Sequence, residues 1–358
     1  MMLLRTKPSI LRLFMVVVVA WGLAACGQEA SHDAPIEHTS SLFVFGTKVD
    51  ITVRGEDQAS LKAAVARLEL EFQHMHKDWH AWKPGELVDL NAAFAAGQSK
   101  TVTPFLLPLI EQAKSLYQLS DGLFNPAIGG LIGAWGFHAD EKPHGALPDL
   151  SAIRALAAQH PSMNDVMIEG DVVSSSNRSV QLDFGGFAKG AALDRAEQVL
   201  KEMGIKNALI NAGGNINTLG SSGAAPWKIG IRDPKSWGVI AILALNSGED
   251  VYTSGNYERF REVDGVRYAH IIDPRDGMPV NHIVSATVIG DGGALLDGAS
   301  TALTVAGPQD WHRIALKMGI KYAVLVDDEG TVYLNPEMRA RIVFAPDQNF
   351  KIVESPSL

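Results

Sequence analysis

One stretch of the sequence joins an acid, two glycines and a lysine where an apolar run meets a helical pattern. It reads LDFGGFAKGAALD and holds Asp183, Gly185, Gly186 and Lys189. A glycine pair lets the backbone turn sharply and lets a ligand approach closely, and the N–H groups that open the next helix favour an anion. The stretch is therefore either a phosphate-binding turn or a plain strand-to-helix turn with Lys189 in solvent, because glycine-rich turns are common.

A second stretch, LLDGAST at 295–301, places an acid and two hydroxyls on an otherwise apolar helical pattern. Asp297, Ser300 and Thr301 are spaced three and four residues apart, so they project from one helix face. Burying them is costly unless they are satisfied. A carboxylate with hydroxyl oxygens suits a hard cation such as Mg²⁺, and a buried hydrogen-bond network without metal is the alternative.

Two further stretches concentrate polar groups. NAGGNINTLG (211–220) ends a β-type run with a glycine pair, which indicates either a tight turn or a ligand contact. Residues 252–280 contain His270 directly before the apolar pair Ile271 and Ile272. A histidine there is either a satisfied core residue or a general base, since its ordinary pKa suits proton transfer near neutral pH.

Three histidines near residue 80 are discounted as a metal site. His76 and His80 are four residues apart and could share a helix face, with His74 nearby. The apolar stripe of that helix omits all three, however, which favours a solvated face.

The elements that must position these groups mix helices and strands without a strict βαβ alternation. Strand patterns dominate 41–55 and recur from about residue 165 up to a hairpin at 322–335. Helical patterns are predicted at 57–80, 103–122, 150–159, 188–204, 293–307 and 308–319, with 122–140 as an ordered glycine-rich loop. This mixture predicts the α+β class, as a single domain of mixed, largely antiparallel sheet with packed helices.

The beginning of the chain resembles a bacterial lipoprotein signal. A basic start and a short apolar run lead to LAAC, which ends at Cys26. We expect a signal peptide at 1–25, a lipidated tether at 26–41 and one domain at 42–358. An ordinary signal peptide with a chance cysteine is the alternative. Because Cys26 is the only cysteine of the 358 residues, internal disulfides and cysteine-ligated zinc are excluded.

The net charge and the hydropathy of the chain limit the kinds of partner that it can bind. The formal net charge is −9, and removing a signal with three basic and no acidic residues makes it −12. Such a chain does not favour nucleic acid, which needs a basic surface. No stretch after the signal is apolar enough to span a bilayer, so membrane association is expected through the lipid alone.

Taken in order, these stretches resemble the ApbE family of FAD:protein FMN transferases. The likeness is carried by FGTKVDI, WKPGELVDLN, DGLFNPAIGGLIGAWGF, LDFGGFAKGAALD, NAGGNI, TSGNYERF, HIIDPRDGMPV and DGASTAL. Asn125 stands where the family usually has Asp, and Trp82 where it usually has Tyr. No single motif decides the resemblance, but eight in register extend over nearly the whole chain after the signal.

The resemblance implies an ApbE-like fold and a Mg²⁺-dependent transfer of the FMN half of FAD to a threonine hydroxyl of a target protein, with AMP released. Catalytic roles are expected for His270 and Asp297. The metal would lie between the carbonyl of Gly186, Asp297 and Thr301, with Ser300 at a further metal position. The resemblance assigns FAD contacts to Phe45, Trp82, Leu123, Phe124, Asn125, Asp183, Lys189 and Ile272.

The resemblance further suggests acceptors among subunits of sodium-pumping quinone reductases or Rnf-type electron-transfer complexes. It places the protein on the periplasmic side of the cell membrane, with the inner membrane favoured over the outer. Two alternatives use the same residues. One is a Mg²⁺-dependent FAD pyrophosphatase that gives FMN and AMP, and the other is a periplasmic lipoprotein that binds flavin without changing it.

Overall fold

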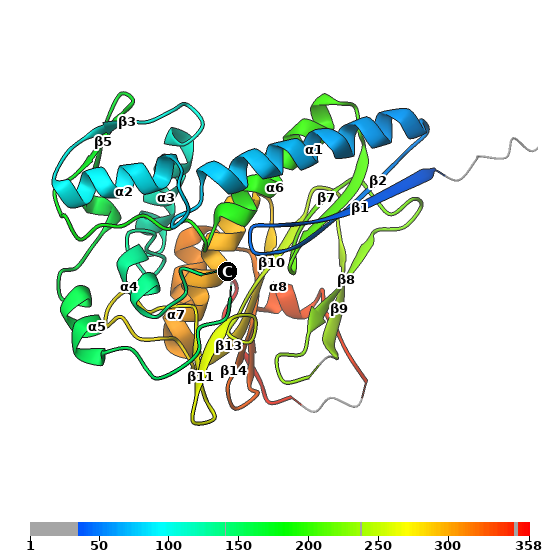
Figure 1. Ribbon diagram of the computed structural model, residues 1–358. Helices are drawn as coiled ribbons and strands as arrows, with labels where there is room; N and C mark the ends of the chain where they lie inside the picture. Colours follow the sequence, from blue (N-terminus) through cyan, green and yellow to red (C-terminus); the bar gives the residue numbers. More distant parts are fainter. Residues whose placement is uncertain (1–34, 140, 237, 347–349) are drawn as a thin grey trace, which may run out of the picture. The chain divides into compact units, whose positions relative to one another are not determined.

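A nine-stranded sheet forms the centre of the structure, a computed structural model that describes residues 35–139, 141–236, 238–346 and 350–358 (Figure 1). Its strand order is β1-β2-β6-β7-β10-β13-β14-β15-β17, and neighbours are antiparallel except for the parallel pair β15 and β17. Its strands are β1 Ile36–Val44, β2 Thr47–Gly55, β6 Asn207–Ala212, β7 Asn215–Leu219, β10 Asp250–Gly255, β13 Ile283–Gly290, β14 Tyr322–Asp327, β15 Val332–Leu334 and β17 Ile352–Glu354.

Three smaller sheets accompany it, in the orders β16-β9-β8, β3-β5-β4 and β11-β12. Their strands are β3 Lys100–Thr101, β4 Val166–Glu169, β5 Val172–Ser175, β8 Trp227–Arg232, β9 Val239–Leu245, β11 Phe260–Val263, β12 Val266–Ala269 and β16 Val343–Phe344. The helices are α1 Gln58–Asp78, α2 Glu86–Ala96, α3 Leu107–Leu119, α4 Gly129–Ala134, α5 Leu150–Ala157, α6 Ala188–Glu202, α7 Gly293–Met318 and α8 Pro336–Arg339, with a 3₁₀ turn at Met163–Asp165.

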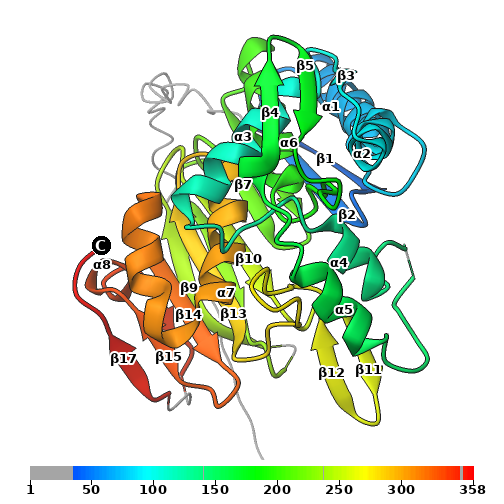
Figure 2. The same ribbon diagram turned by 90° about the vertical axis from the view of Figure 1, so that its left-hand side faces the viewer.

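Helices cover one face of the large sheet, and the β8–β9 sheet covers part of the other. Helix α1 packs on β1 and β2, while α6 and α7 pack on β7, β10 and β13 (Figure 1). Strand β10 contributes side chains to the cores on both faces of the sheet. Tyr252 packs in the helix-side core, and Val251 packs in the core shared with β8 and β9. A third apolar cluster joins α4, α5 and the segment after β12, and Figure 2 shows α4 and α5 beside the β11–β12 hairpin.

The α+β prediction is confirmed, and most predicted elements exist. Helix α1 begins after Asp57, whose carboxylate accepts the N–H groups of Ala59 and Ser60, and it buries the predicted stripe from Leu61 to Met75. The two helices predicted at 293–307 and 308–319 are the two halves of α7, which are separated by a kink at Gly307, whose backbone is not helical, and Pro308. Proline lacks the N–H that would continue the helix, which explains the kink.

Several boundaries were wrong. Strand β1 begins at Ile36, inside the predicted tether, and pairs along its whole length with β2. The run 179–184 is not a strand but an extended segment with one bridge, between Gln181 and Ile128. Helix α4 lies where the sequence indicated a glycine-rich loop, because its glycines hid the helical period, and helix α2 was not predicted.

The predicted signal peptide and Cys26 lie outside the described residues. Within the described part of the chain, no helix combines the length and the apolar character that a membrane crossing needs.

Candidate functional site

The segment that leads into the glycine pair is held in place by a buried asparagine. Asn91 of α2 accepts the N–H of Leu182 at 2.7 Å and donates to its carbonyl at 2.9 Å. The next residue, Asp183, is 6% exposed, accepts the N–H of Gly185 at 2.8 Å and lies 2.9 Å from His138 Nε2. The Asn91 side chain therefore makes the two main-chain hydrogen bonds that a neighbouring strand would make in a sheet. It fixes the turn that opens α6.

Helices α6 and α7 meet at two glycines in direct backbone contact. A Cβ added at Gly190 would lie 2.1 Å from the carbonyl oxygen of Gly293. Only glycine allows that approach, because a carbon atom needs about 3.5 Å from its neighbour. The close crossing brings the start of α6 onto the first turns of α7, which carry Asp297.

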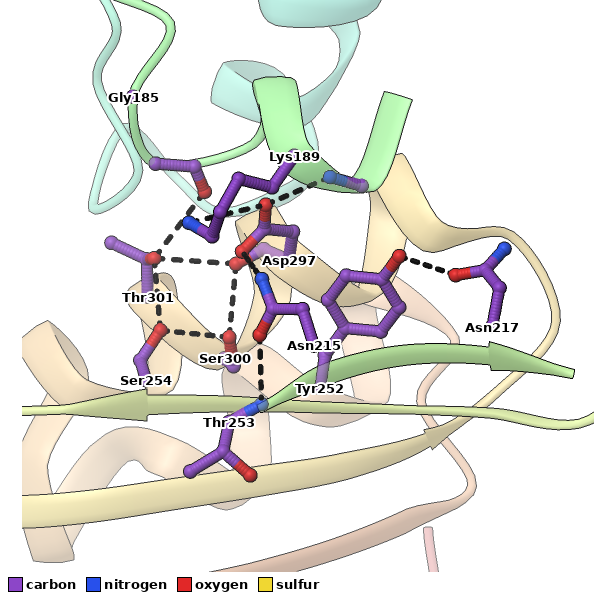
Figure 3. A network of polar contacts seen from close by, with 12 residues as sticks. Gly185, Lys189, Asn215, Asn217, Tyr252, Thr253, Ser254, Asp297, Ser300 and Thr301 are labelled. Carbon is purple, nitrogen blue, oxygen red and sulfur yellow. Dashed lines mark hydrogen bonds and ion pairs between the residues drawn. The ribbon is translucent and has the colours of Figure 1, made fainter. Parts of the chain in front are cut away.

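Asp297 is 3% exposed and has partners for both carboxylate oxygens (Figure 3). Oδ2 accepts the N–H of Gly190 at 3.0 Å and lies 3.9 Å from Lys189 Nζ, while Oδ1 accepts the amide of Asn215 at 2.8 Å. Burial raises the pKa of Asp297, and the positive charge of Lys189 opposes that rise. The anion that the start of α6 holds is thus a carboxylate of the protein itself.

Three hydroxyl oxygens and two carbonyl oxygens gather beside that carboxylate (Figure 3). Ser254 of β10 lies 2.8 Å from Ser300 Oγ and 3.1 Å from Thr301 Oγ1. Thr301 Oγ1 also lies 3.5 Å from the carbonyl oxygen of Gly186 and 3.2 Å from that of Asp297. Ser300 is fully buried and Ser254 half-buried. The predicted grouping of Gly186 with the Asp297 helix face is therefore present, although more than a hundred residues separate them.

This group of residues fits a hard cation. The donors are a carboxylate, hydroxyls and a bare carbonyl, all oxygen, which is the set that Mg²⁺ and Ca²⁺ prefer. Gly186 has no side chain that could cover its carbonyl, and an added Cβ would lie only 3.0 Å from the Phe124 ring. Gly186, Asp297, Ser300 and Thr301 are thus suited to hold a metal.

His270 follows β12, and one of its ring nitrogens is hydrogen-bonded to the main chain. Its Nδ1 lies 3.0 Å from the carbonyl oxygen of Arg259. A carbonyl only accepts, so Nδ1 carries the hydrogen and the Nε2 lone pair is left for proton transfer. Burial, and after it the positive charge of Lys189, lowers the pKa of His270 to about 4. The ring is therefore neutral at physiological pH.

An aromatic row connects two of the predicted flavin contacts. Phe45, in the β1–β2 turn, packs against His76 at 5.9 Å between ring centroids, and His76 lies 5.3 Å from His80. His80 packs on Trp82 at 4.3 Å, and Trp82 stacks on His138 at 4.8 Å with planes 19° apart. The prediction of a solvated histidine face was wrong for His80, which is 8% exposed, because the chain after α1 folds back over it.

The remaining predicted contacts are buried or half-buried. Leu123 and Phe124 are 7% and 3% exposed, and Phe124 packs against Phe187. Asn125 has both amide groups engaged, since it donates to the Pro161 carbonyl and accepts the N–H of Ala127. Ile272 is 5% exposed within the third apolar cluster.

Sequence reasoning missed the residues that hold the functional groups in place. His138, Asn91, Asn215 and Ser254 come from four separate elements or loops and contact Asp183, Leu182, Asp297 and Thr301. Asn215 directly follows the glycine pair 213–214, which is the tight turn between β6 and β7. For Asn215 and Ser254, the only signal in the sequence was the polar residues of NAGGN and TSGN.

Comparison with known proteins decides the family. The family model described as "ApbE family" matches residues 45–325. The chain belongs to the ApbE family. Among its ApbE relatives, the FAD:protein FMN transferase of Rhodobacter capsulatus is 47% identical over 327 residues, which are 91% of this chain and 62% of that protein.

A FAD:protein FMN transferase of Klebsiella pneumoniae is 38% identical over 212 residues, 57% of this chain and 63% of that relative. The chain thus spans a little over six tenths of the length of these two relatives. The crystal structure of the ApbE protein of Thermotoga maritima superimposes with a TM-score of 0.77 at 29% identity, covering 86% of this chain and 99% of that one.

Proposed function

We propose that this protein transfers the FMN half of FAD to a threonine hydroxyl of an acceptor protein in a Mg²⁺-dependent reaction that releases AMP. The observation that carries the proposal is the cluster of Asp297, Thr301 and the Gly186 carbonyl, an oxygen-only site beside Lys189. Membership of the ApbE family and relatives named FAD:protein FMN transferase support it.

The charges of the site suit a pyrophosphate. The chain as a whole is acidic, with a net charge of −9, so it does not attract an anion through its overall field. Lys189 supplies a local positive charge within 3.9 Å of Asp297. When bound, Mg²⁺ would neutralise the pyrophosphate and polarise its phosphoryl oxygens. Gly186, Asp297 and Thr301 would hold the ion, with Ser300 beside them.

The proton of the acceptor hydroxyl needs a neutral base. His270 fits that task because Nδ1 is fixed on the Arg259 carbonyl and Nε2 has its lone pair available. The low pKa of about 4 keeps the ring unprotonated before the reaction. Trp82 and Phe45, in the aromatic row, offer apolar surface for the flavin ring, and Asp183 is oriented by His138 and Gly185.

The lipoprotein signal with Cys26 extends the proposal to location and partners. A lipid anchor would place the domain on the periplasmic side of the cell membrane, and acceptors would be threonine-bearing subunits of quinone reductase or Rnf-type complexes. The support is the sequence pattern ending in LAAC and the family membership.

The test is acceptor labelling. Full-length protein is incubated with FAD, Mg²⁺ and a threonine-bearing acceptor, and flavin fluorescence is followed in a denaturing gel. We expect a fluorescent acceptor band and released AMP, both abolished by chelator and by Asp297→Asn, with Asp89→Asn as the control. Asp89 is an exposed α2 carboxylate whose Lys100 partner is 3.7 Å away.

Free FMN and AMP without a labelled acceptor would refute transfer and indicate the pyrophosphatase. Intact FAD after prolonged incubation would refute both enzyme activities and leave flavin binding alone. Mass spectrometry of the labelled acceptor then identifies the modified residue, and an acceptor with that threonine changed to alanine must stay dark.

A further inference from the structure

Three carboxylates from two elements converge near the N-terminal end of α7, outside the Asp297 cluster. Asp194 and Glu197 stand three residues apart on α6, and Asp250 begins β10. One oxygen from each of the three lies within 4.8 Å of the other two. Asp250 is 1% exposed, and Asp194 and Glu197 are half-buried. None of the three belongs to the site proposed for FAD.

The backbone holds two of these side chains in place. Asp194 accepts the N–H groups of Gly293 at 2.5 Å and Ala294 at 2.9 Å, which fixes it at the start of α7. Asp250 accepts the N–H of Thr218 at 2.9 Å through Oδ1. Because each carboxylate is anchored to the main chain, neither turns away easily to relieve repulsion from its neighbours.

The second oxygen of Asp250 is a polar atom without a partner. Within the part of the chain that the structure describes, no donor reaches Asp250 Oδ2, although the atom is buried. Buried polar atoms are satisfied in the great majority of cases, and an unpaired one is costly. Lys201 lies 2.5 Å from Glu197 Oε1 and offsets one of the three charges. Two negative charges remain uncompensated in a partly buried place.

We propose that Asp194, Glu197 and Asp250 form a second cation site, which takes Ca²⁺ through carboxylate oxygens. Oxygens on one ion are separated by at most twice the metal–oxygen distance, roughly 4.6 to 5.2 Å for Ca²⁺. The observed separations satisfy that limit without movement. The half-buried positions of Asp194 and Glu197 leave room for water ligands and an entry path.

The ion would join α6 and β10, which also carry residues of the reaction site. Asn217 of β7 lies between the two places, with Nδ2 3.3 Å from Asp194 Oδ1 and 3.4 Å from Glu197 Oε2, while its Oδ1 accepts the Tyr252 hydroxyl. Ca²⁺ would thereby fix α6 against β10 and the start of α7. This role concerns stability and does not depend on the flavin chemistry.

A shared proton is the competing way to relieve the repulsion. Burial, and after it the charges of Glu197 and Asp194, raises the pKa of Asp250 to about 8. A protonated Asp250 would need no ion, so the two accounts predict different responses to Ca²⁺.

The test measures Ca²⁺ binding to the full-length protein after treatment with chelator. Equilibrium dialysis against ⁴⁵Ca²⁺ compares the wild type with Asp250→Asn, Glu197→Gln and the control Glu202→Gln. The control is the same substitution on the same helix at an exposed residue outside the cluster. Asp250→Asn keeps an oxygen for the Thr218 N–H, and Glu197→Gln changes a half-buried residue, so both are expected to fold.

We expect the wild type and Glu202→Gln to bind one more Ca²⁺ per chain than Asp250→Asn and Glu197→Gln. Ca²⁺ bound at the Asp297 cluster would be the same in all four proteins and cancels. With free Ca²⁺ about a hundredfold above the Kd, Ca²⁺ should raise the Tm of the wild type and of Glu202→Gln by about 4 °C more than the Tm of the two cluster variants. Equal Ca²⁺ stoichiometry in all four proteins would overturn the proposal, as would a wild-type Tm indifferent to Ca²⁺.

Discussion

The contact between Gly190 and Gly293 allows a sharp prediction, for the substitution Gly190→Ala. The added Cβ would lie 2.1 Å from the Gly293 carbonyl oxygen, 2.4 Å from the Gly293 carbonyl carbon and 2.8 Å from Ala294 N. All three are backbone atoms, so no side chain can move aside. To reach an ordinary contact distance, α6 and α7 must separate by roughly 1 Å at this point.

The separation has two energetic costs. Overpacking of this kind costs about 1 to 3 kcal/mol. The N–H of Gly190 now lies 3.0 Å from Asp297 Oδ2, and moving it by 1 Å breaks a hydrogen bond to a buried carboxylate, which adds about 1 to 3 kcal/mol. We expect a loss of about 3 kcal/mol in the free energy of unfolding, or a urea midpoint lower by about 1 M for an m-value of about 3 kcal/mol/M.

The same movement shifts Asp297 relative to Gly186. A misplacement of about 1 Å at a reacting centre can lower the rate by about a hundredfold. The assay is therefore double: urea unfolding followed by tryptophan fluorescence, and acceptor labelling under conditions where the variant is folded. Both readouts should fall together, because one helix crossing determines both.

The control is Gly130→Ala in α4. A Cβ there meets only Gln181 Oε1, at 3.6 Å, which is an ordinary contact. Because alanine favours a helix over glycine, this variant should be unchanged or slightly more stable, by about 0.5 to 1 kcal/mol. If Gly190→Ala unfolded at the wild-type urea concentration and labelled the acceptor at the wild-type rate, the reasoning from the α6–α7 contact would be refuted.

Three further predictions follow from single contacts. Asn91→Ala leaves the N–H and carbonyl of Leu182 unpaired in a buried place, so the free energy of unfolding should drop by about 3 kcal/mol. An unchanged melting temperature would show that Asn91 does not hold this segment. His270→Ala should slow acceptor labelling by about 10² to 10⁴-fold. In the wild type, kcat/KM should hold down to about pH 5 and fall as the pH drops through about 4, whereas a midpoint near 6.5 would show an unburied imidazole. Thr301→Val keeps the shape but removes the hydroxyl, so the Mg²⁺ concentration for half-maximal labelling should rise at least about tenfold, while Thr301→Ser should restore it.

The sequence predicted the elements whose periodicity was strong. The stripe from Leu61 to Met75 indicated α1 because apolar residues at steps of three and four can only share a face on a helix. The spacing of Asp297, Ser300 and Thr301 likewise predicted one polar face of α7. Helix α2 was not predicted, and the strand expected at 179–184 was wrong, since a buried asparagine took the place of strand pairing at Leu182.

What the sequence determined by itself was chemical type: an acid with hydroxyls on a helix, a glycine pair before a lysine, and an acidic chain that needs local charges to hold an anion. Only the tertiary structure decided which of these groups meet. The Gly186 carbonyl lies 3.5 Å from Thr301 Oγ1 because α6 and α7 cross at two glycines, and residue spacing cannot predict that crossing. The structure also decided that the start of α6 holds Asp297, and that Asp250 lies buried beside two other carboxylates. Both outcomes depend on contacts between residues far apart in the chain, where local pattern carries no information.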